Sequence, residues 1–373
     1  MTEKGLLDPK DQPKPLKLLE LFGGIGAPRR ALENVICSAV KANKINPETF
    51  SLPLALRSID YVEVLPYAVM AYNQIFQCGP APQDIRIWNM SPDIVVHGSP
   101  CQDFSNEGMN NINSGRSILF ERTLQILDPT PLNGFRELSR QPKVIIWENV
   151  PGLLWKFKDC LDYYTDVLEE FGYVSYCKVL TASDYNIPQN RDRVFVVSIL
   201  KEVPNAEQFT FPEKMIQKWK LKDFIDKKVS FDDPTVRLRD AEKAILGQLP
   251  DGTLTVKEGT KKGYAEVQEW QIINLAIPGS KNRRGRVGDN AKTITTAPRQ
   301  AIYYDGNVRM LTAKEYLRLM GFKDCDYEKM RAAGITDQQI CTLAGNSICV
   351  PVLEALFRQL FKLGVISLPG LVL

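Results

Sequence analysis

The sequence predicts an α/β protein with a doubly wound, mostly parallel sheet and a second, smaller domain. Strand and helix patterns alternate from residue 16 to about residue 200, which is typical of a parallel sheet with helices on both faces. The alternation stops near Pro204, and helical patterns return at 312–322 and 350–366. The length of 373 residues also exceeds that of one compact core of ordinary size.

The elements of the larger domain follow one another in a regular order. Apolar runs predict strands at 16–22, 57–64, 93–99, 143–150 and 193–200. Amphipathic patterns predict helices at 27–43, 66–76, 116–127 and 160–171. Because crossovers between parallel strands are right-handed, we expect the functional site at the carboxyl ends of the strands.

Shifts in composition divide the chain into domains. Residues 1–15 are charged and proline-rich, unlike a signal peptide, and predict a disordered lead-in. We assign 16–203 and 336–373 to the larger domain. Residues 204–335 form the smaller one, because up to about residue 308 they are rich in Lys and Gly with only short apolar pieces. No apolar stretch approaches membrane-spanning length, so we expect a cytoplasmic protein without membrane contact.

Cysteine and histidine usage narrows the chemistry. The eight cysteines include no CxxC pair, so we expect neither a metal site nor a disulfide framework. His97 is the only histidine and lies inside an apolar run, where a hydrogen-bonded core histidine is the better interpretation. Cys101, in the stretch "GSPCQDFS", follows that run and has to act without an imidazole. This excludes most hydrolase mechanisms.

A glycine turn follows the first strand. In "LLELFGGIGAPRRALE", a strand, a glycine turn and a helix stand in the order that lets backbone N–H groups approach a nucleotide-like ligand. The turn consists of Phe22, Gly23, Gly24 and Gly26. Its spacing is not GxGxxG, so a dinucleotide with a pyrophosphate is disfavoured.

Two acidic residues at later positions strengthen the ligand hypothesis. Glu63 ends the second strand, where a carboxylate suits the hydroxyl groups of a ribose. Asp84 can accept from an adenine amino group, and Ile85 can cover the ring. Taken alone, each residue fits an ordinary surface or core position as well, but the order of glycine turn, acid and acid favours a bound nucleoside.

The strongest signals are a cysteine, a glutamate and two arginines. Cys101 and Glu148 follow successive strands, so both can reach one pocket at the same sheet edge. An acid at the end of an apolar strand should have a raised pKa and stay protonated. Arg191 and Arg193, in "QNRDR", precede another strand and should point to the same side.

These motifs resemble those of the DNA (cytosine-5)-methyltransferases, in that family's order and along most of the chain. The motifs on which the resemblance rests are "FGGIG", the "PCQ" loop, "ENV", "QNRDR", "RMLTAKEYLRLMGF" and "GNSICVPV". The resemblance implies a Rossmann-like methyltransferase fold and S-adenosylmethionine as cofactor. The implied cofactor-binding residues are Phe22, Gly23, Gly24, Ile25, Gly26, Glu63, Asp84, Ile85, Pro100, Asn346 and Ser347.

The resemblance also implies a role for each catalytic residue. The Cys101 thiolate would attack carbon 6 of a cytosine, and Glu148 would bond ring nitrogen 3 and the exocyclic amine. Arg193 would hold the base carbonyl, and Arg191 would support the Cys101 loop. The methyl group would go to carbon 5, after which the carbon 5 proton and the cysteine would leave.

A base inside duplex DNA cannot be reached in this way, so the cytosine has to be flipped out, at a cost of roughly a few kcal/mol. The polar loop 102–117 would close over it, and the basic stretch 280–292 would bind phosphates. The expected DNA-binding residues are Gln102, Ser105, Arg116, Ser117, Arg283, Arg284 and Arg286. We expect a monomer from a prokaryote or a phage, acting on double-stranded DNA, with a cognate restriction endonuclease as a candidate partner.

Other functions stay open at this point. A tRNA methyltransferase of the same family would carry a Cys-Phe-Thr element in the recognition region, but no cysteine lies between Cys177 and Cys325. A catalytically silent DNA-binding protein usually lacks the Cys or the Glu, and both are present. A nicotinamide-dependent dehydrogenase has a different glycine spacing. Three features depart from the family pattern. They are the long connection 44–58, the asparagine at position 190, which keeps the arginine spacing, and residues 204–308, which match no motif and leave the target sequence unknown.

Overall fold

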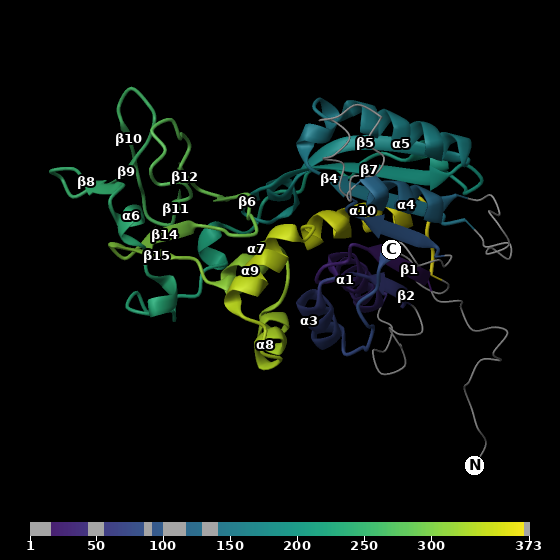
Figure 1. Cartoon of the computed structure of the whole chain (residues 1–373), viewed down its shortest axis with the longest axis horizontal. Helices are drawn as coiled ribbons and strands as arrows, with labels where there is room; N and C mark the ends of the chain where they lie inside the picture. Colours follow the sequence, from purple (N-terminus) through teal and green to yellow (C-terminus); the bar gives the residue numbers. More distant parts are fainter. Residues whose placement is uncertain (1–15, 44–55, 86–91, 100–116, 129–140, 369–373) are drawn as a thin grey trace, which may run out of the picture.

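The chain folds into two lobes, a larger α/β lobe and a smaller β-rich lobe, with α7, α8 and α9 between them (Figure 1). The computed structural model describes residues 16–43, 56–85, 92–99, 117–128 and 141–368, with the backbone alone for 56–60 and 117–118.

The larger lobe contains a sheet in the order β2-β1-β3-β4-β7-β5. Its strands are β1 (Leu16–Leu21), β2 (Leu56–Val62), β3 (Ile94–His97), β4 (Val144–Asn149), β5 (Tyr173–Thr181) and β7 (Asp192–Leu200). Strands β2, β1, β3 and β4 pair in parallel, whereas β7 is antiparallel to both β4 and β5. Five strands therefore run in one direction, which confirms the mostly parallel sheet. The chain winds from β1 first to β2 and later to β3, so a topological switch point lies between β1 and β3.

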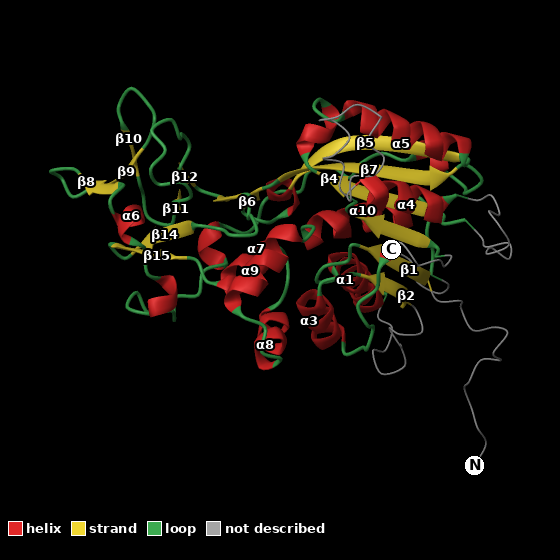
Figure 2. Cartoon of the chain, in the orientation of Figure 1, coloured by secondary structure: helices red, strands yellow, loops and turns green. Residues whose placement is uncertain are grey.

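Helices cover both faces of this sheet (Figure 2). They are α1 (Ala27–Ala42), α3 (Pro66–Phe76) and α10 (Val350–Lys362) on one face, and α4 (Ser117–Leu127) and α5 (Lys158–Glu170) on the other. Leu18 and Ile146 belong to the first core, and their neighbours Leu19 and Trp147 to the second. Burial on both faces explains why the strands read as continuous apolar runs.

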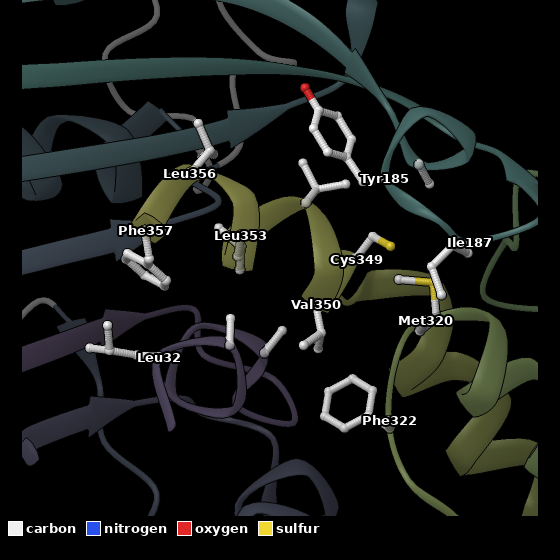
Figure 3. Close-up of a cluster of buried hydrophobic side chains, with 14 of the residues drawn as sticks. Leu32, Tyr185, Ile187, Met320, Phe322, Cys349, Val350, Leu353, Leu356 and Phe357 are labelled. Atoms are coloured by element: carbon white, nitrogen blue, oxygen red, sulfur yellow. The ribbon is translucent and has the colours of Figure 1, made fainter. Parts of the chain in front are cut away.

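Helix α10 is a central part of the first core. Figure 3 shows Leu353 and Phe357 on it, with Leu32 of α1 on one side and Tyr185 on the other. Together, α9 (Asp337–Asn346) and α10 form a stretch, 337–362, that is long and apolar enough to cross a membrane, contrary to the sequence expectation. Its apolar side chains pack in the core, and this packing accounts for the composition.

The smaller lobe is built from short strands and has a core of its own. One sheet contains β8 (Leu246–Gln248), β9 (Leu254–Lys257) and β10 (Tyr264–Glu266), next to α6 (Asp240–Lys243). A second contains β11 (Ile272–Asn274), β12 (Val287–Gly288), β14 (Gln300–Tyr304) and β15 (Asn307–Met310). Ile273 and Met310 face the small core, whereas Ile272 belongs to the main core. The lobes are joined by β6 (Gln189–Asn190), which pairs with β13 (Ala291–Lys292).

The helices after the small lobe pack partly on the large one. They are α7 (Ala313–Leu319) and α8 (Asp324–Ala332). Asp326 of α8 forms a 2.6 Å ion pair with Arg30 of α1, and the Lys329 ammonium donates to the Ile75 carbonyl of α3. These contacts place α8 with the larger lobe, although the predicted boundary at residue 335 assigned it to the smaller one.

Candidate active site

The glycine turn after β1 follows an unusual backbone path. Phe22, Gly24 and Gly26 have φ angles of 56°, 53° and 74°. Residues with a side chain rarely adopt this region, so Phe22 carries strain of about 1–3 kcal/mol. Gly26 is the N-cap of α1, and its N–H donates to the Gly23 carbonyl over 2.8 Å. Such strain is concentrated at functional sites.

A cavity of about 240 Å³ opens at this turn. Its walls include 22–24 of the turn, Glu63 after β2, 96–98 at the end of β3, Glu148 of β4, and 346–348 at the end of α9. The carboxyl ends of four parallel strands, β1 to β4, therefore line one cavity at the switch point, as the fold rule requires. A larger groove of about 810 Å³ lies between α10 and 210–215, and it contains none of the predicted site residues.

Glu148 stands where this cavity meets Arg193. The Arg193 Nε lies 3.0 Å from Glu148 Oε1, although the geometry does not make a well-directed hydrogen bond. Burial raises the pKa of Glu148, while Arg193 and Arg191 act to lower it, and the raising effect prevails. The carboxyl group can therefore hold a proton at a higher pH than usual.

The end of β3 is anchored beside Glu148. The Ser99 carbonyl accepts from Trp147 Nε1 and from Asn149 Nδ2, each over 3.2 Å. A Cβ on Gly98 would lie 3.9 Å from Glu148 Oε2. The chain is thus held against β4 two residues before Cys101.

His97 is a core histidine, as predicted. It is 1% exposed, and its ring nitrogens contact Ser99 Oγ at 3.1 Å and Tyr164 Oη at 2.9 Å. Burial lowers its pKa to about 3, so the ring stays neutral. His97 belongs to the cavity wall, but its neutral, bonded ring is not among the groups that exchange protons.

Arg191 joins three segments. Its guanidinium is 3% exposed and donates to the carbonyls of Ile294, Gly345 and Ser347 over 2.8–3.0 Å. Arg191 follows β6 directly and therefore connects the β6–β13 strand pair, which joins the lobes, with residues 346–348 of the cavity wall. The prediction that it supports the Cys101 loop concerns residues outside the described ranges.

Similarity to known proteins shows the family of this protein. A family model described as C-5 cytosine-specific DNA methylase matches residues 16–362. The chain belongs to the C-5 cytosine-specific DNA methylase family.

Relatives include named methyltransferases. The type II methyltransferase M2.ScrFI of Lactococcus lactis subsp. cremoris is 32% identical over 280 residues, covering 72% of this chain and 67% of that protein. The orphan methyltransferase M.SPRI of Bacillus phage SPR is 24% identical over 458 residues, covering 92% and 97%. The enzyme is therefore a DNA cytosine-5 methyltransferase.

Solved structures share the fold. The Dnmt2 methyltransferase of S. pombe matches with a TM-score of 0.61 and 19% identity, covering 93% of this chain and 98% of that one. A putative DNA modification methyltransferase from an E. coli prophage matches with a TM-score of 0.59 and 19% identity, covering 93% and 99%. At this identity the likeness shows the fold alone.

Six of the predicted cofactor residues of this DNA methylase line the cavity, whereas Ile25, Gly26, Asp84 and Ile85 do not. The Ile25 side chain is 0% exposed and packs in the first core behind the turn, so its assignment to the cofactor site was wrong. Asp84 and Ile85 do not line the cavity; Ile85 belongs to the second core, and its carbonyl accepts from Arg122. Their contact with the adenine stays a prediction.

Several predicted residues cannot be placed. Pro100, Cys101, Gln102, Ser105 and Arg116 lie outside the described residues. Ser117 is the first residue of α4, of which only the backbone is described. Their roles stay predictions.

The basic loop of the methylase contains one misassigned arginine. Arg286 is 1% exposed, and its guanidinium donates to the carbonyls of Asn274, Ala276 and Ile277 over 2.8–3.1 Å. A side chain engaged in this way cannot reach a DNA phosphate, so this prediction was wrong. Arg283 is half-buried and Arg284 is exposed, and both stay candidates.

Sequence reasoning missed three residues that shape the site. Trp147 and Asn149 anchor Ser99, and Tyr61 contacts the glycine turn. Asn149 stands inside "ENV", and Tyr61 lies two residues before Glu63 on the same strand face. Strand alternation alone could have indicated Tyr61.

Proposed function

We propose that the protein transfers a methyl group from S-adenosylmethionine to carbon 5 of a flipped-out cytosine in a specific double-stranded DNA site, through a covalent adduct with Cys101. One observation carries the proposal: the glycine turn and Glu148, a carboxyl with a raised pKa beside Arg193, share a single cavity.

The cavity fits the cofactor chemically. Among the described residues, no heavy atom lies within 4 Å of a Cβ built on Gly24, so this side of the turn is open to a ligand. Glu63 puts carboxylate oxygens into the wall, where ribose hydroxyls can donate, and Leu65 and Leu343 add apolar surface. Asn346 and Ser347 add polar groups to the lining. When bound, S-adenosylmethionine supplies an electrophilic methyl group.

The catalytic steps follow from the residue chemistry. The Cys101 sulfur, as thiolate, forms a bond to carbon 6, and electron density moves through the ring toward nitrogen 3. Protonated Glu148 donates to nitrogen 3 and so offsets that charge, while carbon 5 becomes nucleophilic. Arg193 donates to the base carbonyl. After methyl transfer the carbon 5 proton leaves to a base, the carbon–sulfur bond breaks, and the thiolate returns.

Cys101 can reach such a base. It follows Ser99 by two residues, and two residues of chain extend at most about 7 Å. Ser99 is itself fixed to Trp147 and Asn149, beside Glu148.

The relatives suggest the biological setting. Those named above are a type II enzyme from a bacterium and an orphan enzyme from a phage. We propose the same setting here: a monomer in a bacterial cytoplasm, with a cognate restriction endonuclease as a candidate partner.

Bisulfite sequencing of DNA from a bacterial host that lacks cytosine methylation tests the proposal. Expression of the wild type should protect cytosine in one sequence context, and tritiated methyl transfer by the purified enzyme should confirm it. Cys101→Ser should abolish both signals while DNA binding persists. Cys37→Ser, at an exposed cysteine, is the control and should retain both. Undiminished transfer by Cys101→Ser, or transfer to tRNA and not to DNA, would refute the proposal.

A further inference from the structure

Residues at the end of β2 form three hydrogen bonds with the glycine turn. The Tyr61 hydroxyl donates to the Gly24 carbonyl over 2.5 Å. The Gly23 N–H donates to the Val62 carbonyl over 3.3 Å, and the Gly24 N–H donates to Glu63 Oε2 over 3.2 Å. The neighbouring strand therefore sets the position of the turn.

Tyr61 also supports the turn through its ring. The side chain is 1% exposed and stacks on Tyr72 of α3, with ring centroids 3.8 Å apart. A Cβ on Gly23 would lie 2.6 Å from the Tyr61 ring, and one on Gly26 would lie 2.5 Å from Phe76 and 2.6 Å from Tyr72. The φ of Gly23 is not positive, so the close approach of this ring is what requires glycine there.

The stacked pair of Tyr61 and Tyr72 is also linked to helix α1 by hydrogen bonds through Glu20. The Tyr72 hydroxyl donates to Glu20 Oε2 over 2.7 Å, and Glu20 Oε1 accepts from the Arg29 N–H over 3.1 Å. A chain of contacts thus runs from the turn through two aromatic rings to the first turn of α1. Such a network resists small shifts of any one member.

Glu63 cannot hold the turn and a ribose equally well. Its Oε1 accepts from the N–H groups of Val64 and Leu65 over 2.8 and 3.0 Å, and its Oε2 accepts from Gly24. These bonds occupy three of the roughly four acceptor sites of a carboxylate. A ribose presents two hydroxyl donors for the one remaining site, so the second hydroxyl competes with the bond from Gly24, which is the longest of the three.

We infer that Tyr61 is a positioning residue for S-adenosylmethionine, because its hydroxyl holds Gly24 in place when Glu63 turns to the ribose. The inference rests on the proposed function. Burial, and secondarily Glu63 and Glu20, raises the pKa of Tyr61, so the hydroxyl stays protonated and donates throughout the working range.

The test compares Tyr61→Phe with Tyr173→Phe. Tyr173 is also buried and donates to a backbone carbonyl, that of Pro142 over 2.7 Å, but it lies at the start of β5, away from the cavity. Each variant removes one oxygen atom. Titration calorimetry with S-adenosylhomocysteine, steady-state kinetics and thermal melting are measured for the wild type and both variants.

Tyr61→Phe should raise the dissociation constant for S-adenosylhomocysteine, and the KM for S-adenosylmethionine, about tenfold, with kcat at saturation within about twofold. Amide exchange of residues 22–26 in the bound state should become faster. Tyr173→Phe should bind like the wild type. The inference is overturned if Tyr61→Phe binds like the wild type, or if both variants lose affinity in proportion to a lowered melting temperature. A wild type that does not bind S-adenosylhomocysteine refutes the proposed function instead.

Discussion

Glu148 combines two properties that a proton donor to a base requires. It lines the cavity that also contains the glycine turn, and its pKa is raised by burial despite two nearby arginines. The Arg193 Nε, 3.0 Å away, supplies the positive charge that the carboxylate needs after it has given up its proton. A raised pKa and a charge partner in one cleft are typical of acid–base catalysts.

We expect Glu148→Gln to lower kcat by about 10²–10⁴-fold, because an amide can bond the cytosine edge but cannot transfer a proton to nitrogen 3. The KM for DNA should change little. The decline of wild-type kcat as pH rises through the pKa of Glu148 should also disappear. Stopped-time methyl-transfer assays across pH measure both effects, and a kcat within threefold of the wild type would contradict this role.

Glu20 makes stability depend on pH in an unusual direction. It is 0% exposed, and burial raises its pKa to about 7, against hydrogen bonds from Tyr72 and Arg29 that lower it. The folded protein therefore holds this proton where the unfolded chain, with an ordinary glutamate, has released it. Stability is then fully present below about pH 4.5 and declines as pH rises to about 7.

Glu20→Gln removes this titration. Between pH 4.5 and 7.5 the wild type should lose up to about 3 kcal/mol of unfolding free energy relative to the variant. Urea unfolding at several pH values measures the difference. A difference that does not vary with pH would show that Glu20 titrates normally.

Among the elements, the basic loop between β11 and β12 separates structural from candidate DNA-binding arginines. Arg286 is buried and holds three carbonyls, whereas Arg284 is exposed and donates through Nε to the Gly259 carbonyl over 2.7 Å. The Gly259 N–H in turn donates to the Arg283 carbonyl, so the loop is fixed to the β9–β10 hairpin.

Arg286→Met should cost about 2–4 kcal/mol of unfolding free energy, because three buried carbonyls lose a charged donor. Arg284→Met should cost less than about 1 kcal/mol but reduce the salt dependence of DNA binding by about one unit of slope. Thermal melting and binding at several salt concentrations give the two readouts. Equal melting temperatures of the two variants would contradict a structural role that Arg286 alone has. An unchanged salt dependence of DNA binding in Arg284→Met would contradict its contact with phosphate.

The sequence predicted the elements whose pattern is set by burial on both sides. Four of the five predicted strands match β1–β4 and the fifth matches β7. Strand β5 was missed because it lies at the sheet edge, where Cys177 and Lys178 are exposed and interrupt the apolar pattern. The antiparallel direction of β7 depends on β5, so it could not be inferred either.

The sequence motifs predicted several residues that line the cavity. They did not show which residues of a motif or loop are buried in the core. Phe22, Glu63 and Asn346 line the cavity as expected. Ile25 and Arg286 were misassigned because the sequence of a loop does not show which of its residues turn inward. Tertiary contacts over 103 and 154 positions, such as those of Arg191 with Ile294 and Gly345, leave no local pattern.

At the scale of the whole molecule, Gly345 of α9 lies directly against the backbone of Thr295 in the smaller lobe. A Cβ on it would lie 2.4 Å from the carbonyl carbon and oxygen of Thr295, and its own carbonyl accepts from Arg191. Since the neighbours are backbone atoms, they cannot move aside cheaply. The small lobe and the 346–348 wall of the cavity are thus held at this residue.

Gly345→Ala should lower stability by about 1–3 kcal/mol through overpacking, although alanine in a helix normally gains about 1 kcal/mol over glycine. The displaced wall should also raise the KM for S-adenosylmethionine. Gly79→Ala is the control, because no heavy atom of the described part of the chain lies within 4 Å of the added Cβ. Melting temperatures decide the matter, and a stabilised Gly345→Ala variant would show that the lobes are not in close contact there.

The most direct test uses duplex DNA in which 5-fluorocytosine replaces the target cytosine. Elimination of Cys101 requires carbon 5 to lose its substituent as a cation, which a proton can do and fluorine cannot. With S-adenosylmethionine, the wild type should form a protein–DNA complex that survives denaturing electrophoresis, with the modified peptide containing Cys101, and Cys101→Ser should form none. Absence of the complex from an active wild type, or its attachment to another residue, would contradict the mechanism.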